Sequence, residues 1–376
     1  MNKFLKIVLG SMTACAALFV SCGSDSDEPA PAPGSVSANP SSLTFGYDAS
    51  EATFSVTTSG EWNASTDNDW ISLACTGTAT TSGSVTVRVK ANPSLEARTG
   101  TITLYSGRAT ATVAVSQAGM PLPDPDPDIE VPEGYTLVWH DEFNSGTTLN
   151  TDDWTHQAAS PGWVNNELQT YVKGEYGGQR VTEIKDGHLS ITAFKSGSSV
   201  YSGRVYAKES TGWKYGIIEA SIRLPKGKGT WPAFWMMPVN NDFGTNPWPR
   251  CGEIDIMEEV GYNPNYTSSS LHTQAYNHTK GTQKTAERLT EGAQDNYHVY
   301  RLEWTEDYIR TYVDGRLLLS FNNDKTGNVD TWPFDKPFYV ILNLAWGGDW
   351  GGAQGVDESA LPATMDVDYV RVFQKL

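Results

Sequence analysis

The chain has 376 residues, a formal net charge of −17 and 39% hydrophobic residues, which is ordinary globular material with enough length for more than one domain. Its acidic balance repels phosphate and no basic run offsets it, so we expect no nucleic-acid partner. The 13 Trp and 17 Tyr, many beside Gly, Pro and Asn, favour a protein that offers flat rings to a ligand such as a sugar.

The first 22 residues have the pattern of a secretory leader. Lys3 and Lys6 precede an apolar run from Ile7 to Val20, and small residues lead to Cys22. The run is short for a transmembrane helix. Residues 18–22 resemble a bacterial lipoprotein signal, which implies a signal peptide over 1–21 and lipidation of Cys22. We therefore expect a secreted protein held at the outer membrane by its lipid.

Residues 22–34 contain mostly Ser, Asp, Glu, Pro and Ala, a composition with nothing to bury. This stretch is predicted to be a flexible tether. Its acidic start, residues 24–28, resembles the signals that send Bacteroides-type lipoproteins to the cell surface. We expect membrane contact through the lipid anchor only, and a monomer.

Residues 35–119 alternate Thr, Val and Ser in short runs broken by Gly, Asn and Pro, which predicts a small immunoglobulin-like β-sandwich. The expected strands include 53–57, 84–89, 100–105 and 109–117. Trp62 and Trp70 could form a carbohydrate platform, but in a domain this small core packing is the favoured interpretation. The layout of both tryptophans, Asn92, residues 98–100 and 115–119 resembles the BACON domain. That resemblance implies a spacer or a weak binder of glycan or mucin.

Residues 120–132 alternate Pro with Asp, which favours a semi-rigid extended linker. From 133 to 376 strand-like runs recur and no long amphipathic helix is evident, so we expect one large two-layer β-sandwich. The turn Asp314-Gly315 predicts a hairpin between 308–313 and 316–321. The other expected strands are 137–139, 189–194, 215–224, 234–237, 299–304, 338–344 and 365–373.

The stretch 252–259 is predicted to be a strand that carries acids on one face. Successive side chains point to opposite faces, so Glu253 and Asp255 share one face and Ile254 lies on the other. Alternation would put the next acid at Met257, but the acids resume at Glu258, as expected if a β-bulge accommodates one extra residue. A polar face turned to water is the plain alternative. No Lys or Arg accompanies these acids, and like charges crowded on one strand are unfavourable unless they serve a function. Such crowding raises the pKa of at least one acid, so that one can stay protonated beside an ionised one.

Residues 253–258, together with 226–235, are similar to the active-site region of glycoside hydrolase family 16, laminarinase type. Further matches are 138–143, 163–169, 213–216, 343–348 and 365–373. The resemblance implies a β-jelly roll and a retaining, endo-acting hydrolase. It makes Glu253 the nucleophile, Glu258 the general acid/base and Asp255 the residue that positions Glu253. Glu259 would then be a surface acid.

The resemblance also implies a set of substrate contacts. Asn166 and Glu167 lie in a motif that binds sugar hydroxyls, Arg204 is a further contact, and His272 faces the cleft from a neighbouring strand. The candidates for stacking on sugar rings are Trp231, Trp235, Trp346, Trp163 and Trp213. Some of these rings are expected in the core instead, because large aromatics are commonly buried.

Some members of the family hold a structural calcium ion away from the chemistry, and the resemblance points to Glu142, the Gly187 carbonyl and Asp368 as its ligands. We expect no catalytic cofactor. The expected substrate is β-1,3-glucan (laminarin), with mixed-linkage β-1,3/1,4-glucan as a second one. Two alternatives remain: a galactan hydrolase of the same fold, similar to agarases and carrageenases, and a non-catalytic surface protein that binds glycan.

Overall fold

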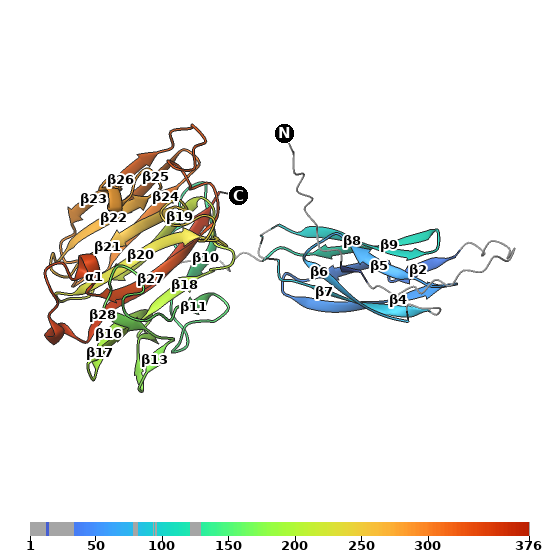
Figure 1. The fold of residues 1–376 in the computed structure, drawn as a ribbon, viewed down its shortest axis with the longest axis horizontal. Helices are drawn as coiled ribbons and strands as arrows, with labels where there is room; N and C mark the ends of the chain where they lie inside the picture. Colours follow the sequence, from blue (N-terminus) through green and yellow to red (C-terminus); the bar gives the residue numbers. More distant parts are fainter. Residues whose placement is uncertain are drawn as a thin grey trace, which may run out of the picture. The chain divides into compact units, whose positions relative to one another are not determined.

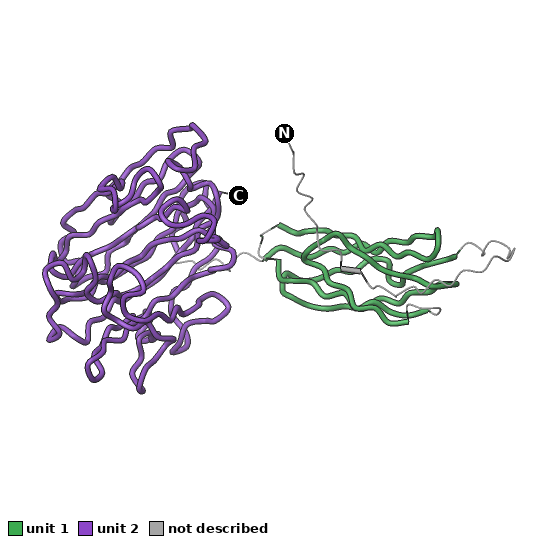
Figure 2. The backbone as a smooth tube through the Cα atoms, in the orientation of Figure 1, with its two compact units in different colours: residues 1–122 green, residues 123–376 purple. Residues whose placement is uncertain are grey.

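The computed structural model describes residues 13–14, 34–77, 82–92, 94, 96–120 and 129–375, and the chain divides into two compact units, 1–122 and 123–376 (Figure 2). The predicted lipidation site Cys22, the tether up to residue 33 and most of the linker lie outside the described residues, as does the leader apart from 13–14.

The regular secondary structure of the described part is almost all strand, which confirms the predicted all-β class (Figure 1). Its helical turns are α1 (Gly348–Gly351), η1 (His278–Lys280) and η2 (Glu358–Ala360). None of these helices is long and apolar enough to cross a bilayer.

The first unit packs two sheets around a small apolar core. One sheet has the strand order β1-β5-β8-β9-β3 and the other β2-β4-β7-β6. Trp62 and Trp70 are buried among the valines of both sheets, which confirms the prediction that they are core residues. The strands are β1 (Thr13–Ala14), β2 (Val36–Asn39), β3 (Ser42–Phe45), β4 (Ser50–Thr58), β5 (Asn63–Thr66), β6 (Ile71–Thr76), β7 (Gly83–Val89), β8 (Arg98–Ser106) and β9 (Ala109–Gln117).

The second unit is a sandwich of two large sheets. The seven-stranded sheet has the order β11-β18-β27-β20-β21-β22-β23. Its strands are β11 (Trp154–His156), β18 (Arg204–Ala207), β20 (Thr230–Pro238), β21 (Glu253–Glu258), β22 (Tyr266–His272), β23 (Lys284–Leu289) and β27 (Phe338–Trp346). Several of these strands, β18 and β22 among them, are short or rich in polar residues and were not among the strand-like runs of the sequence.

The ten-stranded sheet has the order β12-β17-β16-β28-β19-β24-β25-β26, with β10 also paired to β28 and β15 to β16. A two-stranded hairpin, β13 (Glu175–Tyr176) with β14 (Gln179–Arg180), completes the unit. The remaining strands are β10 (Thr136–Asp141), β12 (Gln169–Tyr171), β15 (Thr182–Lys185), β16 (His188–Ser196), β17 (Ser199–Ser202), β19 (Gly216–Arg223), β24 (His298–Trp304), β25 (Tyr308–Val313), β26 (Arg316–Asn322) and β28 (Ala363–Gln374).

Alternation along the strands separates a core face from an outer face of the seven-stranded sheet. Phe234 on β20 and its cross-strand partner Leu342 on β27 are fully buried on the core face, while Trp235 and Asn343 take the other face. The predicted hairpin is confirmed: β25 and β26 pair around Asp314 and Gly315, both with positive φ. The outer face of β27, β20, β21 and β22 is therefore free to carry a site.

Candidate active site

A β-bulge in β21 sets the direction of the catalytic acids. Ile256 has no partner on β20, and between Asp255 and Glu258 the strand has one residue more than β22 opposite it. Ile256 and Met257 both lie in the core, and Glu258 returns to the outer face. The bulge predicted from the broken alternation is thus confirmed.

Gly252 fixes where this strand begins. Its φ of +89° is a conformation that favours glycine, and an added Cβ would lie 2.8 Å from Cγ of Pro333. A larger residue would have to push the start of β21 away from Pro333, and Glu253 follows directly. The chain therefore enters the acid strand through a position that only glycine fills without strain.

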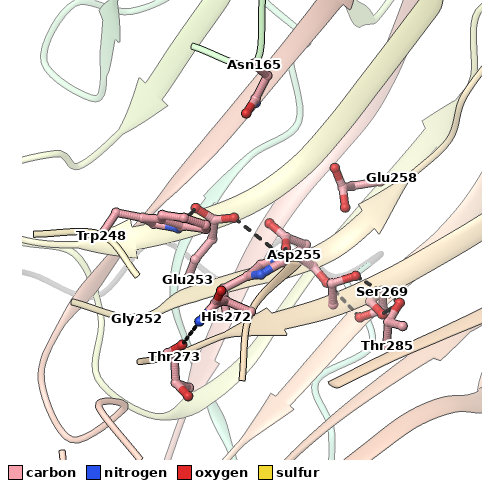
Figure 3. Close-up of polar contacts among 12 residues, drawn as sticks. Asn165, Trp248, Gly252, Glu253, Asp255, Glu258, Ser269, His272, Thr273 and Thr285 are labelled. Carbon is pink, nitrogen blue, oxygen red and sulfur yellow. Dashed lines mark hydrogen bonds and ion pairs between the residues drawn. The ribbon is translucent and has the colours of Figure 1, made fainter. Parts of the chain in front are cut away.

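Two indole N–H groups each donate to one of the two outer acids. Nε1 of Trp248 lies 3.0 Å from Oε2 of Glu253, and Nε1 of Trp231 lies 3.0 Å from Oε1 of Glu258. Figure 3 shows Trp248 against Glu253, with Glu258 further along the same strand. A donor of this kind stabilises the ionised carboxylate, so each acid has its own means of carrying negative charge.

His272 lies opposite Glu253 on β22 and faces two of the acids (Figure 3). Its Nε2 is 3.2 Å from Oδ2 of Asp255 and 3.8 Å from Oε1 of Glu253. The ligand atoms of these three residues lie within 4.8 Å of one another, the one such cluster of His, Cys, Asp and Glu found in the described part of the chain. A cation there would occupy Glu253, so the trio is better suited to sharing protons than to holding a metal ion.

Burial shifts the protonation of all three acids. It raises the pKa of Glu253 to about 8, with the charges of Asp255 and Glu258 adding to the effect. Burial followed by the charge of Asp255 raises the pKa of Glu258 to about 8, and burial raises that of Asp255 well above its usual range. The cluster therefore retains protons near neutral pH, which allows an ionised acid to stand beside a protonated one.

Arg204 organises an aromatic group beside the acids. Its guanidinium carbon lies 5.1 Å from the ring centre of Trp163 and 4.7 Å from that of Trp235. Nε1 of Trp235 donates to Oδ1 of Asn343 at 2.7 Å. Trp163 is 48% exposed, so one of its faces is available to a flat, apolar sugar face.

The two predicted sugar-binding residues Asn166 and Glu167 contact different parts of the protein. Nδ2 of Asn166 donates to Oδ1 of Asp349 in α1. The next residue, Trp350, packs edge to face against Trp231, with ring centres 5.6 Å apart. Glu167 is buried and accepts hydrogen bonds from Gln169, Tyr171 and Asn165. Glu167 therefore organises the loop, and Asn166 reaches the turn at α1.

Comparison with known proteins identifies the family to which the large domain belongs. Residues 168–371 match the family model of glycosyl hydrolases family 16, which is more than half of the chain. This chain belongs to glycosyl hydrolase family 16. Its N-terminal residues 35–120 match the model of the viral BACON domain.

The family 16 domain resembles proteins that act on β-glucan. A β-glucanase of Rhodothermus marinus is 42% identical over 247 residues, which are 64% of this chain and 85% of that protein. The solved structure of SCLam, a non-specific endo-β-1,3(4)-glucanase, is 41% identical with a TM-score of 0.61, covering 66% of this chain and 94% of that one. The laminarinase structure from Rhodothermus marinus is 40% identical with a TM-score of 0.60, covering 64% and 97%. The large unit is thus a family 16 β-jelly roll.

Two of the tryptophans expected to stack on sugar are buried in the family 16 domain, so that interpretation is wrong for them. Trp346 is 1% exposed and pairs with Thr230 on the core face of its strand. Trp213 is 7% exposed and packs against Trp139, with ring centres 5.1 Å apart. Their rings have no free face, because both sides are covered by protein.

Glu259 is also placed differently from the prediction. It was expected at the surface, yet it is 0% exposed and hydrogen-bonded to Asn265 and Gln294. The residue after Glu258 points to the opposite side of the strand, and that side is the interior of the sandwich.

The sequence interpretation missed several residues of this site. Trp248, which donates to Glu253, follows Pro247 and precedes Pro249 in the turn before β21. A tryptophan in a proline turn five residues before an acid strand could have pointed to it. His278 lies 5.0 Å from the Trp248 ring and Asn343 holds Trp235, but neither has a sequence signal beyond its neighbours.

The calcium expectation remains a prediction. Both side-chain oxygens of Glu142 accept hydrogen bonds from Arg371, and Nδ1 of His140 lies 3.0 Å from one of them. That carboxylate is thus already neutralised and does not fit a cation site as it stands. Asp368 is exposed, and Gly187 forms a turn with φ +77° between β15 and β16.

Proposed function

We propose that this chain is a retaining, endo-acting glycoside hydrolase that cleaves β-1,3-glucan such as laminarin, and mixed-linkage β-1,3/1,4-glucan as a second substrate. The observation that carries the proposal is the bulge in β21, which returns Glu258 to the face that Glu253 occupies. Each acid keeps its own indole donor there. Membership of family 16 and the β-glucanases among its relatives support the substrate class.

The first half of the reaction breaks the glycosidic bond. Protonated Glu258 gives its proton to the bridging oxygen, so the aglycone sugar leaves as a neutral alcohol. Ionised Glu253 forms a bond to the anomeric carbon and holds the other half of the chain as an ester. The N–H of Trp248 stabilises the ionised form of Glu253 and so works against the burial that raises its pKa to about 8. Burial raises the pKa of Asp255 well above its usual range, and a protonated Asp255, with Nε2 of His272 3.2 Å from its Oδ2, does not repel ionised Glu253.

The second half reverses the roles. Glu258, now a carboxylate that accepts the N–H of Trp231, takes a proton from a water molecule. The oxygen of that water attacks the anomeric carbon, and Glu253 leaves as a carboxylate. Two displacements restore the original configuration, which is why the enzyme is retaining.

A product profile tests the assignment. Wild type is expected to release reducing sugar from laminarin and lichenan, with oligosaccharides from the start of the reaction, and none from agarose or carrageenan. Glu258→Gln is expected to lose about 10²- to 10⁴-fold in kcat on polysaccharide, because the proton donor is gone. Glu253→Gln should fall to background. Activity in the Glu253→Gln variant would sink the assignment, and release from agarose alone would favour a galactan hydrolase.

We also propose that the protein is a monomer anchored through a lipid on Cys22 at the outer membrane and exposed at the cell surface. This part rests on the leader pattern alone, because Cys22 lies outside the described residues. Wild type is expected to enter the detergent phase of a Triton X-114 extract and Cys22→Ser to remain in the aqueous phase. Equal partitioning of both forms would refute the anchor, and protease digestion of intact cells tests the surface location.

A further inference from the structure

Glu259 is a buried acid that the catalytic scheme does not use. It is the first residue after β21 and directly follows Glu258. No Lys, Arg or His of the described residues pairs with it, and its hydrogen-bond donors are neutral amides. An acid buried without a cation costs stability, so its presence calls for an explanation other than charge pairing.

The contacts of Glu259 join three segments of the chain. Oε1 accepts the backbone N–H of Asn265, just before β22, at 2.5 Å, and it accepts Nε2 of Gln294 at 3.1 Å. Oε2 accepts the same Nε2 at 3.2 Å. Gln294 belongs to the turn between β23 and β24. The carboxylate thus ties the end of β21 to the start of the next strand and to the turn that connects β23 with β24.

This tie lies where β21 is least supported by its own pairing. The bulge leaves Ile256 without a partner, and pairing with β22 resumes only at Glu258. The backbone N–H of Glu259 makes a long bond, 3.4 Å, to the carbonyl of Pro232. The direction of Glu258 therefore depends on what holds the residue that follows it.

We propose that Glu259 is a positioning residue that holds the end of the bulged strand, so that Glu258 meets the indole N–H of Trp231. The inference rests on the proposed function, in which Glu258 is the general acid. Glu259 touches no substrate and acts through the geometry of Glu258 and Trp231. Its neighbour Tyr300 is fully buried on β24, and the charge of Glu259 adds to the burial that raises the pKa of that hydroxyl.

The pH profile separates positioning from plain stability. Without the tie, Glu258 loses the N–H of Trp231, and because that donor favours the ionised form its loss raises the pKa of Glu258. Glu259→Ala is expected to move the alkaline limb of kcat/KM on laminarin upward by about one pH unit. It should lower kcat about tenfold or more with KM within about twofold, since misplacement affects the chemical step. Glu259→Gln keeps an acceptor oxygen for the backbone N–H of Asn265, and its NH2 can donate to the side-chain oxygen of Gln294 once that amide turns round, so it should retain most of kcat.

A double variant shows whether the effect passes through Trp231. If it does, Trp231→Phe with Glu259→Ala should have the same alkaline limb as Trp231→Phe alone, because the same hydrogen bond cannot be lost twice. Independent, additive shifts would overturn the proposal. An unchanged limb in Glu259→Ala, with only a lower Tm, would also overturn it and make Glu259 a structural residue.

Two controls complete the design. Glu219→Ala removes another buried acid, paired with Arg301 on the other sheet, and should lower Tm without moving the limb. Should Glu259→Ala not fold, Gln294→Ala removes the side-chain bonds of the tie, leaves the bond to the N–H of Asn265, and should move the limb in the same direction by a smaller amount. A wild-type enzyme inactive on laminarin and lichenan would refute the proposed function instead, which is a different outcome from an active enzyme whose limb does not respond.

Discussion

Replacing either indole donor by Phe is predicted to move a different limb of the pH profile of kcat/KM. Trp231→Phe removes the N–H that Glu258 accepts at 3.0 Å and keeps a ring in place. A hydrogen bond to a charged group contributes about 1.5–3 kcal/mol, and one pKa unit corresponds to about 1.4 kcal/mol, so the pKa of Glu258 should rise by about 1 to 2 units. Glu258 must be protonated to act, so the alkaline limb moves up from near its pKa of about 8.

Trp248→Phe is the matched variant for the nucleophile. It removes the N–H that Glu253 accepts at 3.0 Å and should raise the pKa of Glu253 by a similar amount. Glu253 must be ionised to attack, so here the acid limb, set by its pKa of about 8, moves up and the pH range of activity narrows from the acid side. The assay is kcat/KM on laminarin from about pH 4 to 10. If both variants move the same limb, or either limb moves down, the roles given to Glu253 and Glu258 are wrong.

Three further predictions concern other parts of the chain. Gly252→Ala should cost about 1–3 kcal/mol in urea unfolding and lower kcat, because φ is +89° and Pro333 is close, whereas Gly177→Ala, with φ +61° and open space, should leave kcat unchanged. Trp62→Ala should destabilise the N-terminal unit by about 3–5 kcal/mol in calorimetry while laminarin hydrolysis stays as in wild type. Because Arg371 already neutralises Glu142, EDTA should leave the Tm of the family 16 domain and its kcat at 25 °C unchanged; a lower Tm would favour the calcium site that the family resemblance implies.

The bulge could be predicted from the sequence because it is a matter of counting along one strand. Acids at 253 and 255 followed by one at 258 break a period of two, and one extra residue restores it. Both neighbours in the sheet confirm that solution. The hairpin at Asp314 and Gly315 was predictable for the same reason, since its signal is local.

The fate of individual tryptophans could not be predicted in this way. Trp231 pairs with Ala345 and Trp346 pairs with Thr230, so these two rings on adjacent strands lie one position out of step and on opposite faces. Both residues are tryptophans in strand-like sequence, so the sequence does not distinguish them. The register between β20 and β27, which are more than a hundred residues apart in the chain, decides which ring is buried. Glu259 is similar, because its partner Gln294 comes from a turn 35 residues later.

The bulge also divides the catalytic strand into two halves that can change separately. At the end of β21 that carries Glu253, the residues Gly252, Trp248 and His272 position the nucleophile. At the end that carries Glu258, Trp231 and the hydrogen bonds of Glu259 position the general acid. An engineer who wants an enzyme for alkaline conditions can therefore alter the second half and leave the first untouched. Related enzymes with different working pH are therefore expected to differ more in the residues around the general acid than in those around the nucleophile.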